Sequence, residues 1–211
     1  MLAARALDSL VKTRYGDSLV IVEWHPYSTD MLNINPDDSI RVSRYQHNQG
    51  QPSLVLDGYL QLAMPSDPSE YYGTFDAAIR TVKSTASYVT LAATGDADTV
   101  EGRIVVTLAM DSITPGSTPT LYCVVTEDSL LDPLGGAYFR VPVQFVPDRN
   151  GVPVSLARGD TLVDTLTFAT AGHRLDKLGA AVFIEDESGT EDHRVLQSAT
   201  ISQFALTEDN K

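Results

Sequence analysis

Cysteine offers a wide range of side-chain chemistry, and this sequence contains a single one, Cys123. A redox dithiol and an internal disulfide each need two cysteines, and a zinc site built on thiolates needs several. Cys123 lies within the apolar run LYCVV, where no sequence neighbour supplies a base or a positive charge. Because free cysteines are among the most buried residues, we expect Cys123 to be a thiol of the hydrophobic core.

The histidines give one candidate position. His47, His173 and His193 are scattered without the spacing of metal ligands, so no histidine metal site is predicted. His25 differs because it follows Trp24 at the end of an apolar run, and sites in open α/β sheets form at the carboxyl ends of strands. Trp24 and His25 are therefore candidate site residues. The structural alternative is that Trp24 packs and His25 is solvated.

Two acidic loops, GDADTVEG at 95–102 and EDESGTED at 185–192, contain the densest carboxylates. Alternating carboxylates can bind Ca²⁺, but neither loop has the spacing of an EF-hand. We expect two solvated hairpin turns, with a calcium-binding sandwich as a weaker alternative. The sequence has no G-x-S-x-G, P-loop or dinucleotide motif, so no cofactor is predicted and no enzyme class is favoured.

Composition excludes some classes of function. The 211 residues are 43% hydrophobic and 20% charged, which is sufficient for a packed core, and the net charge is −13. A nucleic-acid binder would need basic residues to displace counterions from phosphates, so no nucleic-acid partner is predicted. No apolar run approaches the roughly 20 residues of a membrane span. Met1 leads directly into a helical pattern, so no signal peptide is expected within this chain.

The first part of the chain alternates helical and extended patterns. Apolar residues at helical spacing predict a helix that Gly16 ends, and the apolar segment 18–25 predicts a buried parallel strand. Asp57-Gly58 between two apolar runs is a strong hairpin signal of type I′. Two further helices are expected: one that Asp37-Asp38-Ser39 could cap and that runs to about Asn48, and one over 74–84 that Thr74 caps.

From about residue 87 short β patterns replace the helical periodicity. Seven runs separated by Gly, Pro, Asp and Asn clusters predict an antiparallel sandwich. The runs are YVTLAAT, RIVVTLAM, LYCVVTED, FRVPVQFV, TLVDTLTFA, GAAVFIED and RVLQSATISQF. We therefore divide the chain into residues 1–86 and 87–211.

Helix, buried strand, helix, X-Pro, hairpin and helix follow one another in the order of a thioredoxin fold. Gln51-Pro52 stands where thioredoxins carry a cis-proline. The chain resembles an exported bacterial family that joins a thioredoxin-like domain to an immunoglobulin-like sandwich. The segments that carry the resemblance are ARALDSLVKTRYGDSLVIVEWHP, GQPSLVLDG, LYCVVTED, FRVPVQFVPDRNGVPVSL and AAVFIEDESGTEDHRVLQSA. The family is named for a twenty-eight-kilodalton outer-membrane protein. The resemblance implies a cis bond at Pro52, a corner formed by Trp24, His25, Gln51 and Pro52, and a periplasmic, outer-membrane-associated or extracellular location.

The sequence departs from that family at its start. In the family a strand and a C-x-x-C motif precede the first helix, whereas this chain begins at Met1 within that helix. The resemblance therefore implies an α/β thioredoxin-like domain, incomplete at its N-terminus, followed by an all-β immunoglobulin-like sandwich. Residues 18–25 and 53–56 would then flank a slot, and buried unpaired strand groups are costly. We expect another segment, a second copy or rearranged pairing to fill the slot; direct pairing of the two segments would contradict this.

Two functions follow as hypotheses. The first is a non-catalytic exported protein for binding or assembly, with a protein partner or a homo-oligomer formed through the open sheet. The alternative is a fragment of a thiol–disulfide oxidoreductase whose C-x-x-C segment is encoded upstream of Met1. No enzymatic activity is expected for the chain as written, because it lacks that motif.

Overall fold

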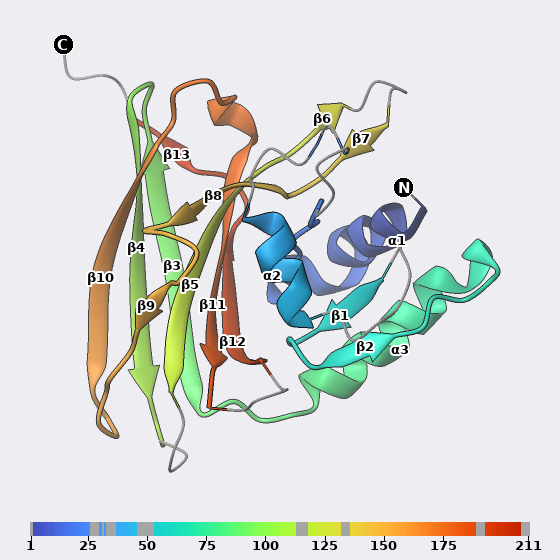
Figure 1. The fold of residues 1–211 in the computed structure, drawn as a ribbon, viewed down its shortest axis with the longest axis horizontal. Helices are drawn as coiled ribbons and strands as arrows, with labels where there is room; N and C mark the ends of the chain where they lie inside the picture. The colour runs from blue at the N-terminus through green and yellow to red at the C-terminus, as the bar shows by residue number, and fades with distance from the viewer. Residues whose placement is uncertain are drawn as a thin grey trace.

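A computed structural model describes residues 2–25, 30, 32, 37–45, 53–112, 118–131, 136–188 and 193–207. A β-sandwich and a group of helices with a short hairpin lie side by side (Figure 1). The N-terminal elements are α1 (Leu2–Leu10), the π-helical turn η1 (Val11–Tyr15), the 3₁₀ turn η2 (Gly16–Ser18), α2 (Asp38–Tyr45), β1 (Leu54–Leu56), β2 (Leu60–Leu62), the 3₁₀ turn η3 (Pro68–Glu70) and α3 (Tyr71–Lys83).

All seven predicted β runs form strands. The described strands after α3 are β3 (Val89–Ala97), β4 (Glu101–Met110), β5 (Pro119–Glu127), β6 (Leu130–Leu131), β7 (Ala137–Tyr138), β8 (Val141–Val146), β9 (Val152–Pro153), β10 (Thr161–Ala169), β11 (Leu178–Asp186), β12 (Arg194–Ile201) and β13 (Ala205–Leu206), with the 3₁₀ turn η4 (Leu175–Lys177) before β11. One sheet has the order β10-β4-β3-β13 and the other β12-β11-β5-β8, with β9 beside β5. The ladders are antiparallel except β3–β13.

The strands β5 and β11 are buried on both faces of their sheet. Leu121, Cys123 and Val125 of β5 point into the core between the two sheets. Their neighbours Tyr122 and Val124 belong to a second cluster on the outer face. Double burial explains why these strands have near-continuous apolar sequences, since no solvent-facing position requires a polar residue.

The outer face of that sheet is covered by residues predicted as a thioredoxin-like strand. We expected residues 18–25 to form a buried parallel strand, and this is wrong: Gly16–Ser18 is a 3₁₀ turn, and residues 19–25 join no ladder of the described chain. Val22 and Trp24 instead pack on the outer cluster of the sandwich. The apolar character of the segment is therefore satisfied by burial against the sandwich without strand pairing.

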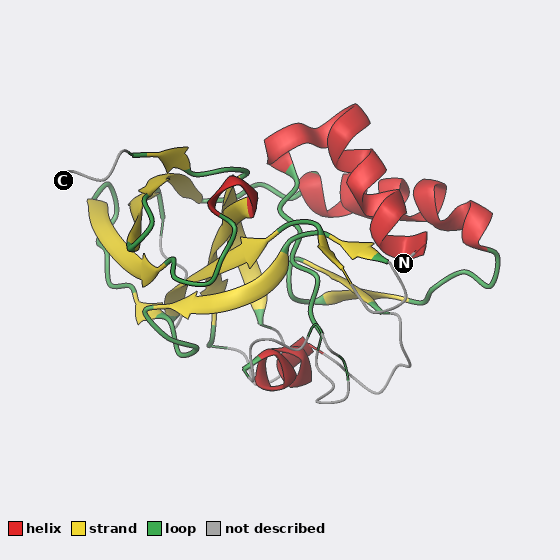
Figure 2. Cartoon of the chain, turned by 90° about the horizontal axis from the view of Figure 1, so that it is seen from above, coloured by secondary structure: helices red, strands yellow, loops and turns green. Residues whose placement is uncertain are grey.

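The helices lie on both sides of the β1–β2 hairpin. Figure 2 shows α1 and α3 together on one side and α2 alone on the other. The first group has its own core, composed of Leu10, Leu56, Phe75, Ile79 and Val82. The first helical segment ends as expected at Gly16, whose φ is +54°.

The predicted hairpin is confirmed. β1 and β2 pair antiparallel with Leu56 opposite Leu60. Asp57 and Gly58 have φ values of +48° and +74°, the two positive values that a type I′ turn requires. The register leaves Tyr59 as one extra residue in the turn, a detail that the Asp-Gly pair alone does not predict.

The other two helices are also present, with one corrected start. α2 begins at Asp38 within the predicted range, and residues 46–48 lie outside the described residues. α3 begins at Tyr71, so Thr74 lies inside it and is not its cap. The preceding 3₁₀ turn is capped by Asp67, whose carboxylate accepts a hydrogen bond from Ser69 N–H at 2.9 Å.

The two parts of the chain are in contact. α3 ends at Lys83 and β3 begins at Val89, while the division into domains at residue 86 stays a prediction. Val195 N–H of β12 donates to Asp57 O in the hairpin turn at 2.8 Å. No helix in the described part of the chain is long and apolar enough to cross a membrane.

Candidate functional site

A cavity of about 440 Å³ lies where the helical part meets the sandwich. Its walls come from α1, residues 19–25, α2, residues 53–58 and residues 138–140, with Phe183, Val195 and Ser198 from the sandwich. Residues 19–25 and β1 therefore border the same cavity, and they do not pair with each other among the described residues. The direct pairing that would have contradicted the predicted slot is therefore not seen among the described residues, and what fills the slot stays a prediction.

Trp24 and His25 both line this cavity. Trp24 stacks on Phe145 with ring centroids 5.7 Å apart, so it packs as the structural alternative proposed. His25 is buried rather than solvated, with its edge on Tyr138 and its Nδ1 2.8 Å from Oδ2 of Asp30. Burial alone would raise the pKa of Asp30, but the hydrogen bonds from His25 and from Leu32 N–H outweigh it and lower that pKa.

Gln51 and Pro52, the other half of the predicted corner, lie outside the described residues. The cis bond expected at Pro52 is therefore untested. In the described chain a cis peptide bond occurs between Val146 and Pro147.

Glu23 and Arg140 form a polar side of the cavity. Glu23 N–H donates to Arg140 O, and Phe139 N–H donates to Oε2 of Glu23, each at 3.2 Å. Burial raises the pKa of the Glu23 carboxyl above its ordinary value, and the Phe139 hydrogen bond acts in the opposite direction. Arg140 has a positive φ of +56°, and its Nη1 is buried without a hydrogen-bond partner among the described residues.

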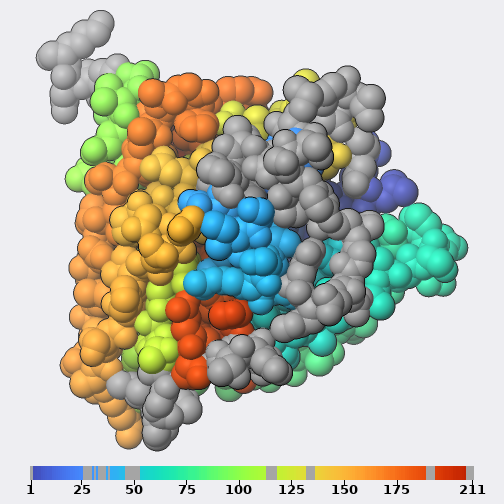
Figure 3. Space-filling model, in the orientation of Figure 1, coloured from blue at the N-terminus to red at the C-terminus, as the bar shows by residue number. Residues whose placement is uncertain are grey.

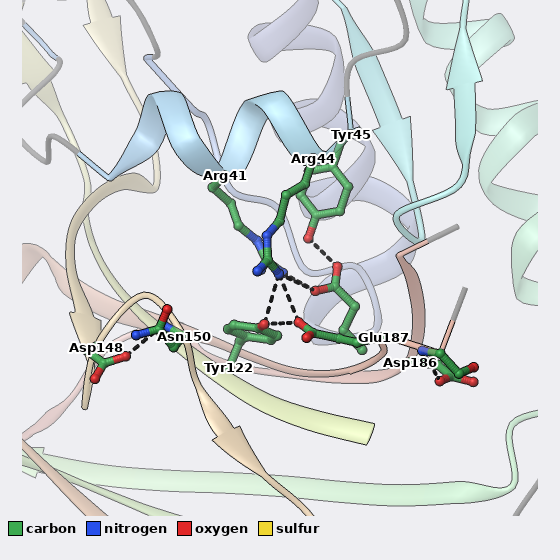
Figure 4. A network of polar contacts seen from close by, with 10 residues as sticks. Arg41, Arg44, Tyr45, Tyr122, Asp148, Asn150, Asp186 and Glu187 are labelled. Carbon is green, nitrogen blue, oxygen red and sulfur yellow. Dashed lines mark hydrogen bonds and ion pairs between the residues drawn. The ribbon is translucent and has the colours of Figure 1, made fainter. Parts of the chain in front are cut away.

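A second polar network joins α2 to the sandwich (Figure 4). Arg41 is 2% exposed, and its Nη2 lies 2.6 Å from Oε2 of Glu185, which is fully buried. The guanidinium carbon of Arg41 lies 4.0 Å from the ring centroid of Tyr122, and the ring of Phe183 is also close. Tyr45 O–H donates to Oε1 of Glu185 at 2.6 Å. The carboxylate charge is thus neutralised within the protein, as burial requires.

The outer part of this network contains Arg44, Tyr122 and Glu187. Arg44 Nη1 donates to Tyr122 O–H at 3.0 Å and to Glu187 at 2.9 Å, and Tyr122 O–H donates to Glu187. Burial raises the pKa of Glu187, but these hydrogen bonds outweigh burial and lower it. Burial, followed by the bond to Glu187, raises the pKa of Tyr122. In the space-filling view α2 lies against the sandwich beside the β8–β9 segment (Figure 3).

The network corrects one interpretation of the sequence. We expected residues 185–192 to form a solvated acidic turn, but Glu185 and Asp186 belong to β11 and Glu185 is in the protein interior. Residues 189–192 lie outside the described residues. One sequence feature indicates the burial of Glu185: it directly follows the apolar run AAVFI. A carboxylate buried there needs a cation, which Arg41 supplies.

The other predicted acidic loop is a hairpin turn. Asp98 accepts hydrogen bonds from Val100 N–H and Glu101 N–H, which lower the pKa of its carboxyl. Within the described residues, no three His, Cys, Asp or Glu side chains gather to form a metal site. Cys123 is a core thiol, as predicted, and burial raises its pKa to about 12. Neither feature provides a reactive group at the cavity.

No family model matches the sequence, and no curated protein matches it either. Among solved structures, HBP35 of Porphyromonas gingivalis aligns over 82% of this chain with a TM-score of 0.67 and 11% identity. The alignment covers 60% of the HBP35 chain, so this chain corresponds to part of that protein. A domain of the outer membrane lipoprotein Omp28 from Porphyromonas gingivalis aligns over 59% of this chain and 93% of its own, with 11% identity and a TM-score of 0.41. The likeness to HBP35 shows a shared fold.

Proposed function

We propose that this protein is a non-catalytic exported binding protein of the cell envelope and that its partner binds in the cavity between residues 19–25 and β1. The observation that carries the proposal is the cavity itself, which is large enough for a ligand and whose walls combine apolar side chains with polar and charged groups. Export is supported by the sequence resemblance to the outer-membrane family. The fold likeness to HBP35 supports the scaffold.

The chemistry available at the cavity favours binding. The single cysteine of the sequence lies in the sandwich core and does not line the cavity. The described groups that line it are apolar side chains, carboxylates, the hydroxyls of serine and tyrosine, the His25 imidazole and one guanidinium, which can bury apolar surface and form hydrogen bonds. These are the interactions of a recognition site.

Site-specific photocrosslinking in the native host tests the proposal. A p-benzoylphenylalanine at position 55, in the cavity wall, should crosslink to a partner in the envelope fraction. The same group at position 77, on the exposed side of α3, should give no such product. The proposal fails if the protein stays in the cytoplasmic fraction or if position 55 gives no crosslink.

The nucleotide sequence upstream of Met1 tests the alternative. An in-frame segment that encodes C-x-x-C would favour a thiol–disulfide oxidoreductase, because the dithiol would precede a helix N-terminus that stabilises a thiolate. A start codon without such a segment would exclude it.

A further inference from the structure

The cavity is bordered by residues 20–24 and by β1, and neither stretch pairs with a described strand on its cavity side. β1 pairs with β2 along one edge, and its other edge pairs with no described strand. Between residues 20 and 24, the one backbone hydrogen bond to described residues is Glu23 N–H to Arg140 O. Backbone N–H and C=O groups away from water need partners, and free strand edges supply them to an incoming strand.

The other walls suit apolar side chains. Ala3, Ala4 and Leu7 of α1 face the cavity, as do Phe183 and Val195 of the sandwich. The small alanine side chains leave room, while the larger residues provide apolar surface. Successive side chains of a strand point to opposite faces. A strand bound in the cavity can therefore direct alternate side chains toward α1 and toward the sandwich.

Among the described residues that line the cavity, the carboxylates of Asp8, Glu23, Asp30 and Asp57 outnumber the single guanidinium of Arg140, so a cationic group in the ligand is favoured. Asp8 is paired with Lys12 at 2.7 Å and Asp30 with His25 at 2.8 Å. Glu23, by contrast, forms no ion pair with any described residue. Burial already disfavours the charged form of Glu23. A basic side chain brought into the cavity would neutralise this carboxylate where water screens it little.

We propose that the cavity binds an extended, predominantly apolar strand of a partner protein, which adds to the free edge of β1 and places a lysine or arginine beside Glu23. This rests on the proposed function and specifies its partner. Strand addition is a common mode of peptide recognition, in which main-chain hydrogen bonds give affinity and side-chain pockets give specificity. A small apolar molecule would form no main-chain hydrogen bonds with β1 and no ion pair with Glu23, so a strand accounts for more of the described groups.

Tryptophan fluorescence provides a direct test with the full chain. Trp24 is the single tryptophan in the sequence and lines the cavity. The probe is acetyl-Val-Lys-Val-Thr-Val-amide, which spans about 16 Å when extended and so exceeds the length of β1. Two matched peptides replace its lysine with glutamine or with glutamate, and a third replaces the central valine with proline, which removes an N–H donor. The lysine peptide should bind most tightly, and the glutamate and proline peptides at least about fivefold more weakly.

Three variants locate the binding. Ala4→Phe fills the cavity and should abolish the fluorescence change, whereas Ala77→Phe on the exposed side of α3 should leave it unchanged. Glu23→Gln should weaken the lysine peptide by at least about fivefold and leave the glutamine peptide unaffected. Because burial raises the pKa of Glu23, this variant should not lower the urea midpoint of unfolding, which separates a binding role from a structural one.

The outcomes separate the inference from the proposed function. The inference is overturned if the lysine peptide does not bind at millimolar concentration, if its binding survives Ala4→Phe, or if the three charge variants bind equally. A crosslink from position 55 to an envelope partner, combined with any of these results, would leave the proposed function standing without the strand. If the crosslinked partner is a second copy of this chain, its cavity-binding segment should itself be extended and contain a basic residue.

Discussion

The sequence neighbours of Glu185 suggest the wrong environment for its side chain. The residue stands at the start of an acidic stretch, yet its side chain is fully buried and bonded to Arg41 and Tyr45 of α2. The exposed pair Arg174–Asp176, with its nearest charged atoms 3.6 Å apart, is the opposite case. Water screens the exposed pair, so it contributes little to the free energy of unfolding. Removal of one partner from the buried pair, by contrast, leaves an uncompensated buried charge.

Substitution of Glu185 should therefore be costly. Glu185→Gln should lower the free energy of unfolding by about 3 kcal/mol, because Arg41 would remain buried without its counter-ion. Asp176→Asn, at the exposed pair, should change it by less than about 0.5 kcal/mol. Urea denaturation of both variants gives the comparison. The double variant Arg41→Leu/Glu185→Leu should be less destabilised than Glu185→Gln, and equal or greater loss would argue against a charge effect.

At the scale of elements, the β1–β2 hairpin is positioned by its turn. Asp57 O accepts a hydrogen bond from β12, and a Cβ at Gly58 would lie 1.8 Å from His193 O. Glycine at 58 therefore serves two purposes, since it permits the positive φ and the close approach of the hairpin to the sandwich. Gly73 in α3 has neither constraint, because a Cβ there meets nothing within 4 Å.

These two glycines should respond to alanine in opposite directions. Gly58→Ala should destabilise the protein by at least about 2 kcal/mol, through the left-handed backbone and the contact with His193. Gly73→Ala should stabilise it by roughly 0.5–1 kcal/mol, because alanine favours helix over glycine. Thermal unfolding followed by circular dichroism measures both. A neutral Gly58→Ala variant would mean that the hairpin does not contact the sandwich in this way.

At the scale of the whole molecule, α2 and residues 19–25 cover the outer face of the β5–β11 sheet. Val22 and Trp24 contribute apolar contacts there, and the ion pairs of Arg41 and Arg44 connect α2 to β11 and to Glu187. The helical part and the sandwich thus share a buried polar junction. The stability of this junction depends on the ionised state of its carboxylates.

Acid should weaken the junction through Glu187. Its pKa is lowered in the folded protein, so its stabilisation is present above the unfolded value near 4.3 and is lost as pH falls through the lower folded value. The urea midpoint should fall as pH decreases below about 4.3, and Glu187→Gln should flatten that fall. Glu101→Gln, at an exposed position, serves as the control. Parallel pH profiles for Glu187→Gln and the unmodified protein would contradict the assignment.

Local sequence patterns determined the elements whose formation needs few distant contacts. Asp57-Gly58 specified the turn, the seven β runs specified the sandwich strands, and the apolar surroundings of Cys123 specified its burial. In each case turn geometry or side-chain periodicity acts within a few residues. Only the tertiary structure decided that Val22 and Trp24 pack on the sandwich while residues 19–25 join no ladder of the described chain. The same holds for Arg41, which neutralises Glu185 from 144 positions away. An apolar segment can be buried either as a strand in a sheet or by packing on one. The sequence around a carboxylate does not identify a distant cation that pairs with it. The cavity beside β1 belongs to this second class, because segments from the helical part and from the sandwich must come together to form it.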